Sequence, residues 1–503
     1  MTTAVRVVAV SLVTSLTLLG GGYVWADAAD IVPGPLTARA PEPPPTPPAP
    51  EPLVSPPAGA DPAPVGLPPG TAPEVDAATL SAALAPLLAD PALGPAVTLS
   101  VRDLTTGAEV VTRTSDAVLE PASTVKLVTA AAALRVLGAE RRLVTRVAWV
   151  PGDQRPSGVP ALVLVGGGDL LLGAGEHDPA VTDGRVGLQG LARTAVANLT
   201  GPTIPTGPTR PTATGPLLGP GVTTVDVVVD DSLLGSGPPP VRDPVDAVYV
   251  SAPTSLAVAA GRRGAGAGRD PAPAVTAGQV FAGAVATALV ETLGAAAPAV
   301  GPVQVSAVPV PVGSELARGE SAPVADVVGY LLVTSDNTVA DAVAGLVAVE
   351  RGRPGDLPAV GRLLVESLRE GGIDLGPTTV ADGSGLGDGS LSSAAALSGL
   401  LAVAAAAPPG DDLALLPSLL PVAGLEGTLS SRFTDGDGSA AGRGVVRAKT
   451  GTLTGVVALA GVGTTADGRG VSFALLSGGV PPGGTAAARA AADRVVASVT
   501  ACC

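Results

Sequence analysis

The sequence of 503 residues is short of several residue types on which enzyme chemistry often depends. It has one histidine, His177, and two cysteines, Cys502 and Cys503, which are the last two residues. Two adjacent cysteines cannot build a disulfide framework or a zinc site. A Ser-His-Asp hydrolase is also excluded, because no serine has glycine both two positions before and two positions after it, and His177 is the sole imidazole. His177 lies in a Gly- and Asp-rich stretch, where we expect a solvated loop residue.

Basic residues are also scarce. Asp and Glu total 44 against 29 Lys and Arg, which gives a net charge of −15. Nucleic acid is therefore not expected as a partner, because no basic excess is present to neutralise phosphates. Just two of the basic residues are lysines, Lys126 and Lys449. Arginine does not release its proton in a protein, whereas a buried lysine can, so both lysines are candidates for roles that need an amine. Chance placement in an arginine-rich composition is an equal alternative.

Residues 1–30 predict an export segment. Arg6 is followed by an uncharged, largely apolar run over residues 7–26, which suits either a cleaved signal peptide or a retained membrane anchor. A Pro-rich linker is predicted over residues 31–75, with 17 prolines between residues 33 and 73. Such a tract adopts extended polyproline II and acts as a semi-rigid spacer. We therefore expect an exported protein of the cell envelope, membrane-anchored or secreted.

Alternating apolar and polar residues predict two strands near the start of the folded region, joined by the turn Thr105-Thr106-Gly107, and three more strands near its end complete one sheet. The predicted strands are 97–103, 108–113, 445–452, 456–462 and 470–477. Helices are predicted on either side of this sheet, at 76–88 and 486–499. The predicted fold class is α/β, of the α+β type, with one five-stranded antiparallel sheet between helices.

Residues 146–312 have a different pattern. Short strands, such as 161–165 and 225–229, are separated by Gly- and Pro-rich connections. We interpret this block as inserted domains with β-rich cores. It would divide the main domain into two segments, 76–145 and 313–503.

The stretch from Pro121 to Gly138 predicts a buried helix with a reactive group at its start. Pro121 suits a position just before a helix, and Gly138 suits a helix end. The residues between them are apolar nearly all round, so a lysine among them loses its hydration. Ser123 and Lys126 are three residues apart, which places both side chains on one face of the first turn. This arrangement is typical of a serine nucleophile activated by a lysine whose pKa is lowered.

Two more short motifs follow Ser123-x-x-Lys126 along the chain. Ser335-Asp336-Asn337 begins a predicted helix, and Lys449-Thr450-Gly451 lies on the predicted strand 445–452. This trio is known from penicillin-binding proteins and class A β-lactamases. Because it uses both lysines and one of the two asparagines of the chain, chance is a poor explanation for it.

The chain resembles the class C low-molecular-mass penicillin-binding proteins, the D-Ala-D-Ala carboxypeptidase/endopeptidase family, over about residues 76–503. Three further stretches carry the closer match: Gly166–Asp169, Asp230–Leu233 and Asp382–Leu386. The resemblance implies a transpeptidase-like catalytic domain with a large insertion between Ser123 and Ser335. It also implies a serine-type D-Ala-D-Ala carboxypeptidase, with endopeptidase action left open, that trims peptidoglycan stem peptides through an acyl-serine intermediate. Acylation by β-lactam antibiotics is implied, and no metal or organic cofactor is.

The same resemblance assigns roles to the motif residues. Ser123 would attack the peptide carbonyl and Lys126 would take its proton. Ser335 would pass a proton to the leaving D-alanine, Lys449 would polarise that serine, and Asn337 would hold the substrate amide.

The resemblance also implies a substrate-binding strand. Thr450, together with Lys449, would bind the terminal carboxylate of the peptide, and the Thr452 amide would complete an oxyanion hole with the Ser123 amide. Gly451 would leave room for the substrate backbone. We expect Asp336 to be a solvated carboxylate at a helix start, and residues 382–386 to have a structural role more than a substrate contact.

Alternatives to this function, and to the interpretation of two short stretches, remain in view. A class A β-lactamase deacylates with a Glu and a nearby Asn, but the one asparagine outside the trio, Asn198, has no Glu in the four residues before it. A catalytically idle protein that binds cell-wall peptides would have no need of Lys126. Gly166–Gly168 has no lysine after it, so we interpret it as a tight turn more than a phosphate loop, and Asp230-Asp231 as a strand-end cap more than a metal site.

Overall fold

In the computed structural model, the structure describes residues 72–201, 216–234, 237, 241, 244–263, 268–355 and 357–502. The chain divides into two compact units, Met1–Ala60 and Asp61–Cys503, and all the described residues lie in the second. The predicted export segment and nearly all of the predicted linker lie outside the described residues.

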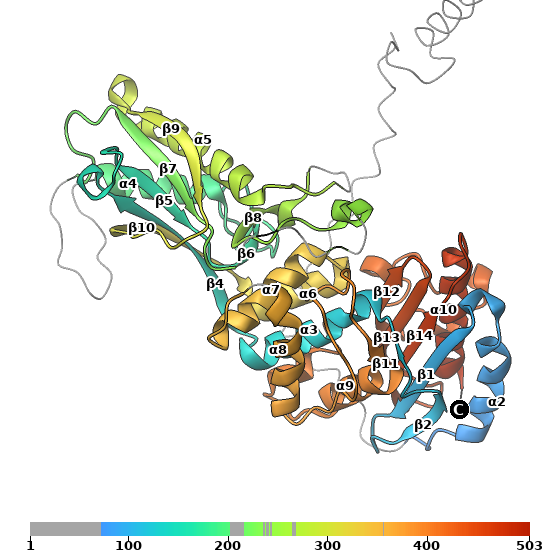
Figure 1. The fold of residues 1–503 in the computed structure, drawn as a ribbon. Helices are drawn as coiled ribbons and strands as arrows, with labels where there is room; N and C mark the ends of the chain where they lie inside the picture. Colours follow the sequence, from blue (N-terminus) through green and yellow to red (C-terminus); the bar gives the residue numbers. More distant parts are fainter. Residues whose placement is uncertain are drawn as a thin grey trace, which may run out of the picture. The chain divides into compact units, whose positions relative to one another are not determined.

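The five-stranded antiparallel sheet predicted from the sequence is present, with strand order β12-β13-β14-β1-β2 (Figure 1). Its strands are β1 (Ala96–Asp103), β2 (Glu109–Arg113), β12 (Arg447–Leu453), β13 (Val456–Thr464) and β14 (Gly470–Gly478). Side chains along β13 alternate between the two faces, so Val457 and Leu459 belong to one apolar core and Ala458 and Ala460 to the other. Both faces of the sheet are therefore covered.

Helices cover the two faces of this sheet, as Figure 1 shows. One face packs against α2 (Ala77–Leu88) and α10 (Thr485–Ala501), and Asp76 caps the first of these through its side chain. The other face packs against α9, behind which lies a cluster of four helices. The four are α3 (Lys126–Val136), α6 (Val324–Thr334), α7 (Asn337–Glu350) and α8 (Leu357–Glu370), and α9 itself spans Ala394–Ala406. Two short strands, β3 (Val118–Leu119) and β11 (Ser392–Ser393), pair with each other beside this cluster.

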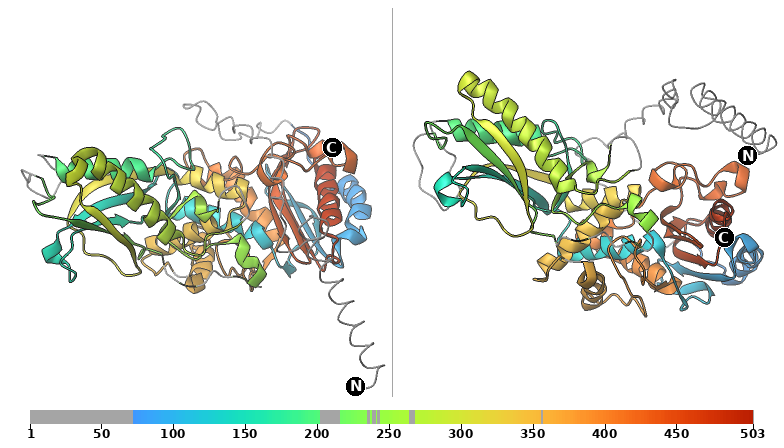
Figure 2. Two further views of the ribbon diagram at one scale, coloured as in Figure 1. Left: turned by 90° about the horizontal axis from the view of Figure 1, so that it is seen from above. Right: turned by 45° about the horizontal axis from the view of Figure 1, so that its top comes forward.

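A second sheet, of order β10-β4-β5-β7-β9, forms the inserted region (Figure 2). Its strands are β4 (Arg142–Val150), β5 (Ala161–Val165), β7 (Thr224–Asp230), β9 (Ala299–Ser306) and β10 (Ser314–Pro323). Strands β5, β7 and β9 run parallel, whereas β4 is antiparallel to both of its neighbours. The sheet begins at Arg142 and ends at Pro323, so it starts four residues before the predicted 146–312 and ends eleven residues after it.

Two helices cover one face of the inserted sheet, α4 (Leu188–Thr200) and α5 (Pro273–Leu293). Neither helix is predicted from the sequence, which indicates only the strands. A small parallel pair, β6 (Asp169–Leu172) and β8 (Leu256–Val258), lies beside this sheet. The short 3₁₀ turns are η1 (Pro91–Leu93), η2 (Ala122–Val125), η3 (Gly152–Gln154), η4 (Pro244–Tyr249), η5 (Ala259–Gly261), η6 (Gly294–Ala296), η7 (Asp412–Leu415), η8 (Gly427–Leu429), η9 (Asp435–Asp437) and η10 (Ala440–Gly442).

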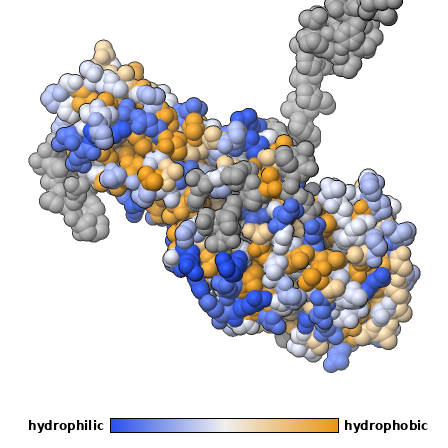
Figure 3. All heavy atoms as spheres, viewed as in Figure 1, coloured by the Kyte–Doolittle hydropathy of each residue, from blue (hydrophilic) through white to orange (hydrophobic). Residues whose placement is uncertain are grey.

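The helical segment Pro273–Ala296 is, in the part of the chain that the structure describes, the one long and apolar enough to cross a membrane by length and composition. Its Phe281, Val285 and Leu289 are fully buried in the core that α5 shares with the inserted sheet. This is the packing of a core helix. On the face shown in Figure 3, apolar and polar residues are interspersed.

Candidate active site

The turn that carries Ser123 is strained and closely packed. Ala122, just before it, has φ 47°, in the left-handed region that residues with a side chain rarely adopt. Ser123 lies in the 3₁₀ turn η2, and the α-helix begins only at Lys126. A Cβ on Gly385 would lie 2.2 Å from the Ala122 carbonyl oxygen, so residues beyond 380 pack directly against this turn. Strain of this kind is typical of functional sites, where the surrounding structure maintains it.

The Lys126 amine has three partners. Its Nζ lies 3.1 Å from Ser123 Oγ, 2.7 Å from Asn337 Oδ1 and 2.8 Å from the Ser384 carbonyl oxygen. The Asn337 and Ser384 oxygens can only accept, so each takes one N–H bond of the amine. The third position of the nitrogen faces the Ser123 hydroxyl, which can also donate. A neutral amine with two N–H bonds and one lone pair satisfies this set completely. The Asn337 amide is oriented by its other end, because Nδ2 donates to the Tyr249 carbonyl at 3.1 Å.

Burial governs the protonation of Lys126. The side chain is fully buried, and the loss of hydration lowers its pKa to about 8. Three carboxylates, of Asp341, Asp382 and Asp336, oppose this effect, and Arg269 adds to it. The amine is therefore close to losing its proton near neutral pH, as a general base must.

Asp382 builds the turn that supports Lys126. Its Oδ1 accepts from the Ser384 amide, the Ser384 hydroxyl and the Gly385 amide, and its Oδ2 accepts from the Gly387 amide. These bonds fix the Ser384 carbonyl, which accepts from Lys126. The neighbouring Gly383 carbonyl accepts from the Thr129 hydroxyl of α3 at 2.6 Å. The position of Asp382 thus fits the structural role expected for residues 382–386.

Lys449 meets Ser335 from the facing strand. Its Nζ donates to Ser335 Oγ and to the Thr450 carbonyl, each at 2.9 Å. Ser335 ends α6 in the left-handed conformation, with φ 57°. Lys449 is fully buried, and burial lowers its pKa well below the ordinary value, with the Lys126 and Arg432 charges acting in the same direction. Because no carboxylate in the part of the chain that the structure describes pairs with this amine, an anionic group placed beside it would restore its proton.

The rest of strand β12 packs on the nucleophile turn. A Cβ on Gly451 would lie 2.7 Å from the Pro121 carbonyl oxygen, so glycine allows the strand to approach Ser123 closely. This steric reason differs from the room for substrate expected from the sequence. Thr450 Oγ1 donates to Thr428 Oγ1 at 3.0 Å, and Thr452 Oγ1 accepts from Arg489 Nε of α10 at 3.3 Å.

The expectation that Asp336 is solvated is wrong. Its side chain is fully buried, and Oδ2 accepts from Arg262 Nη2 at 2.7 Å and from Arg269 Nη2 at 2.9 Å. Its Oδ1 caps α7 by accepting from the Val339 amide. Both arginines belong to the inserted region, so the insert fixes the turn between Ser335 and Asn337.

The structure brings together all the residues predicted for catalysis. Ser123, Lys126 and Asn337 form one hydrogen-bonded group and Lys449 and Ser335 a second, and the two groups meet because Ser335 and Asn337 share one turn. Sequence reasoning missed several neighbours: Tyr249, Arg262, Arg269, Asp341 and Thr428. Only Asp341 carried a sequence signal, as a lone carboxylate in the apolar stretch four residues after the asparagine.

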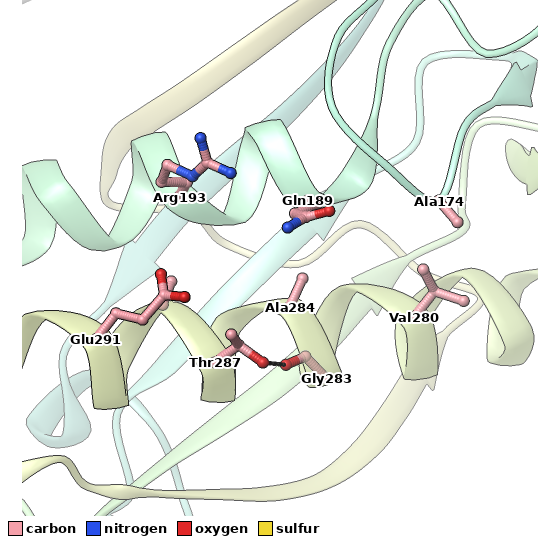
Figure 4. A pocket seen from close by; sticks show the side chains of 9 residues that line it. Ala174, Gln189, Arg193, Val280, Gly283, Ala284, Thr287 and Glu291 are labelled. Atoms are coloured by element: carbon pink, nitrogen blue, oxygen red, sulfur yellow. Dashed lines mark hydrogen bonds between the residues drawn. The ribbon is translucent and has the colours of Figure 1, made fainter. Parts of the chain in front are cut away.

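The lone histidine and one cavity of the inserted region belong to other parts of the fold. His177 is exposed, and its Nδ1 accepts from the Gly187 amide. Within the described residues, no group of three or more His, Cys, Asp or Glu could hold a metal ion. A cavity of about 290 Å³ lies between α4 and α5, with Gln189 and Arg193 on one side and Thr287 and Glu291 on the other (Figure 4). It contains no motif residue.

Taken together, the antiparallel sheet between helices and the serine–lysine pair at its edge define an active-site serine hydrolase of the penicillin-recognising class. A family model described as the D-Ala-D-Ala carboxypeptidase 3 (S13) family matches residues 80–272 and 264–501. The chain belongs to that family, and its enzyme class is that of a serine-type D-Ala-D-Ala carboxypeptidase.

Two relatives match over nearly the whole chain. Carboxypeptidase DacB of Mycolicibacterium smegmatis is 33% identical over 512 residues, which covers 99% of this chain and 96% of the relative. A carboxypeptidase of Mycobacterium tuberculosis is 33% identical over 463 residues, which covers 91% of this chain and 90% of the relative.

A solved structure shares the fold. Penicillin-binding protein 4 of Haemophilus influenzae has a TM-score of 0.59 and 20% identity, covering 84% of this chain and 98% of that chain. The penicillin-binding-protein fold predicted from the three motifs is confirmed.

Proposed function

We propose that Ser123, Lys126, Ser335, Asn337 and Lys449 catalyse hydrolysis of the terminal D-Ala-D-Ala bond of peptidoglycan stem peptides, outside the cytoplasm. The observation that carries the proposal is the set of partners of Lys126. Two pure acceptors take two of its N–H bonds, so the third position of the nitrogen faces Ser123 Oγ and carries the lone pair once the amine is neutral. A protein that merely bound peptides would not need this arrangement.

Acylation begins with proton transfer between these two groups. Ser123 Oγ forms a bond to the carbonyl carbon of the penultimate D-alanine, and its proton moves to Lys126 Nζ. The carbonyl oxygen becomes an oxyanion, which the amides of Ser123 and Thr452 stabilise. When the tetrahedral intermediate collapses, the peptide C–N bond breaks, and the leaving amine takes through Ser335 the proton that Lys126 had accepted, which leaves Lys126 neutral. Water then attacks the carbonyl carbon of the acyl-serine and gives a proton to Lys126. The bond from that carbon to Ser123 Oγ breaks, Lys126 returns the proton to Ser123, and the shortened peptide is released.

Strand β12 binds the carboxylate of the departing D-alanine. Lys449 and the Thr450 hydroxyl offer a cation and a neutral donor together, as carboxylate recognition requires. Substrate binding re-protonates Lys449, because the incoming negative charge offsets the effect of burial. The Lys449–Ser335 contact of 2.9 Å then links this anchor to the proton path of the leaving group. β-Lactams, which present a carboxylate beside a strained amide, acylate Ser123 in the same orientation.

Endopeptidase action on cross-linked peptides and anchoring through residues 1–30 are parts of the same proposal. The proposal keeps the predicted domains, which are a catalytic body at 76–145 and 313–503 and an insert at 146–312. The sheet of the insert extends beyond these bounds, from Arg142 to Pro323. Both parts serve one site, because Asp336 of the body pairs with arginines of the insert.

The test is labelling of the purified protein with a fluorescent penicillin, in the wild type and in Ser123→Ala. We expect a covalent adduct that survives denaturation in the wild type and none in the variant. Digestion of cell-wall muropeptides should in parallel release D-alanine from pentapeptides. The absence of a Ser123-dependent adduct would leave a peptide-binding protein as the better description, whereas rapid loss of the adduct with hydrolysed penicillin would favour a β-lactamase.

A further inference from the structure

One buried carboxyl group close to Ser123 has no place in the mechanism above. Asp341 lies on α7 four residues after Asn337, so the two side chains are one helical turn apart on the same face. Asp341 is 8% exposed, and neither of its carboxyl oxygens has a hydrogen-bond partner among the described residues. Buried polar groups in folded proteins are nearly always paired, so an unpaired carboxyl here needs a physical reason.

The surroundings of Asp341 connect it to Lys126. Burial raises its pKa well above the ordinary value, and the Asp382 charge acts in the same direction. The Lys126 charge opposes both effects, and so do the Gly383 amide and the Ser384 hydroxyl, which lie near the carboxyl group but outside hydrogen-bond geometry. A Cβ on Gly383 would lie 2.5 Å from the Ala340 carbonyl oxygen, so α7 beside Asp341 packs against the same turn whose Ser384 carbonyl accepts from the lysine.

The other charges that face Lys126 are already compensated. Asp382 accepts four hydrogen bonds, and Asp336 is paired with Arg262 and Arg269. Arg269 of the insert acts against the ammonium, and burial lowers the pKa of Lys449, on the facing strand, well below its ordinary value. Of the three carboxylates that favour protonated Lys126, Asp341 is the one with no hydrogen-bond partner among the described residues, and its effect is the largest.

We propose that Asp341 is a positioning residue of the acylation step, whose buried carboxylate is the counter-charge for the ammonium that Lys126 becomes when it takes the Ser123 proton. The two groups interact strongly enough to titrate as a pair, because each charged form favours the other. This inference rests on the proposed function, in which Lys126 is the base. It explains why the helix that carries Asn337 also carries a carboxyl one turn further on.

The structure leaves room for the charged form of Asp341. A cavity of about 10 Å³ borders it, lined also by Thr338 of α7 and by Ser251 and Thr254 of the insert. This is about the space of one water molecule, and the hydroxyl groups around it provide polar neighbours. A carboxylate at this position can thus be hydrated by one water molecule.

The chain offers a direct measurement, because it contains just two lysines. Labelling the full-length protein with ¹³C-lysine gives two Cε resonances, which Lys449→Arg assigns. In the wild type we expect the Lys126 signal to titrate near pH 8, with a second inflection from Asp341. In Asp341→Asn the Lys126 midpoint should fall by about one pH unit, because the carboxylate no longer favours the ammonium.

Asp169→Asn is the matched control. Asp169 is 2% exposed, and burial raises its pKa to about 6, but it belongs to β6 of the insert and is not among the charges that act on Lys126. Its substitution should leave the Lys126 midpoint unchanged. Equal midpoints in Asp341→Asn and Asp169→Asn would overturn the inference. If Asp341→Asn does not fold, a wild-type Lys126 titration with a single inflection would overturn it instead.

Acylation kinetics give a second measurement on the same proteins. The rate of fluorescent-penicillin acylation should rise with pH through the Lys126 midpoint and reach a plateau. In Asp341→Asn this rise should move to lower pH by the same unit, and the plateau should fall by up to about tenfold, because a weaker base removes the proton. Asp341→Glu, which keeps the carboxyl, should restore the wild-type profile. Failure of the wild type to form any adduct would refute the proposed function, while the lysine titration would still decide the role of Asp341.

Discussion

The two turns that supply catalytic groups are supported in different ways. The turn at Ser123 is supported from within the catalytic body. Asp382 accepts hydrogen bonds from the Gly385 and Gly387 amides, and the turn that they form packs closely against Ala122 through Gly385. The turn at Ser335–Asn337 is held from the inserted region by the two arginines on Asp336 and by the Tyr249 carbonyl on Asn337. The insert is therefore part of the support of the active site.

This difference matches what each turn must do. Lys126 has to lose and regain a proton, and two neutral oxygens, Asn337 Oδ1 and the Ser384 carbonyl, hold its nitrogen without adding a formal charge. Asp336 has no proton to transfer, and buried ion pairs with two arginines can hold it rigidly. Among the charges that act on the pKa of Lys126, Arg269 comes from the insert, and it favours the neutral amine.

The largest expected effect separates the two lysines. Lys126→Arg keeps a cation but cannot give up its proton, so acylation by fluorescent penicillin should fall by about 10³-fold. Lys449→Arg keeps the charge that binds a carboxylate, and we expect a loss of about tenfold, mainly in the concentration of penicillin needed for half-maximal rate. Comparable losses in the two variants would contradict the assignment of Lys126 as the base.

A smaller effect is expected where the insert holds Asp336. Arg269→Gln removes one of two partners of a fully buried carboxylate, which should cost about 2–3 kcal/mol in the free energy of unfolding. Acylation should also fall, by at least about tenfold, because Asn337 loses its position against Lys126. Chemical denaturation and penicillin acylation measure the two effects.

Arg155→Gln provides the control for this substitution. Arg155 pairs with Asp226 at 2.8 Å inside the insert, and its side chain is 14% exposed against 11% for Arg269. The Arg155→Gln variant should lose a similar amount of free energy of unfolding. Its acylation rate, measured well below the unfolding transition, should stay unchanged. An equal loss of acylation in both variants would show that the insert matters only through general stability.

Much of the active site and of the main sheet can be predicted from the sequence, because the patterns that define them are local. Ser123 and Lys126 share one turn, and the first two strands of the main sheet alternate between apolar and polar residues, so local spacing predicts both. The burial of Asp336 could not be predicted, because its partners Arg262 and Arg269 lie 74 and 67 residues before it. No local pattern connects a loop of one domain with a helix cap of another. The helix α5 was missed because its alanine- and glycine-rich sequence has weak periodicity. The helix α4 does show apolar residues at helical spacing, a signal that the interpretation of this block as β-rich overlooked.

The smallest effect is expected at the far side of the insert. Arg193 of α4 pairs with Glu176, but both side chains are about half exposed, so Arg193→Gln should change the free energy of unfolding by less than about 1 kcal/mol. The residue also borders the cavity between α4 and α5, where no catalytic group lies. Acylation should therefore match the wild type across the pH range. A changed acylation rate in this variant would mean that the insert acts on the active site through more than the contacts at Asp336 and Asn337, and the comparison between the two turns would then have to include the helices of the insert.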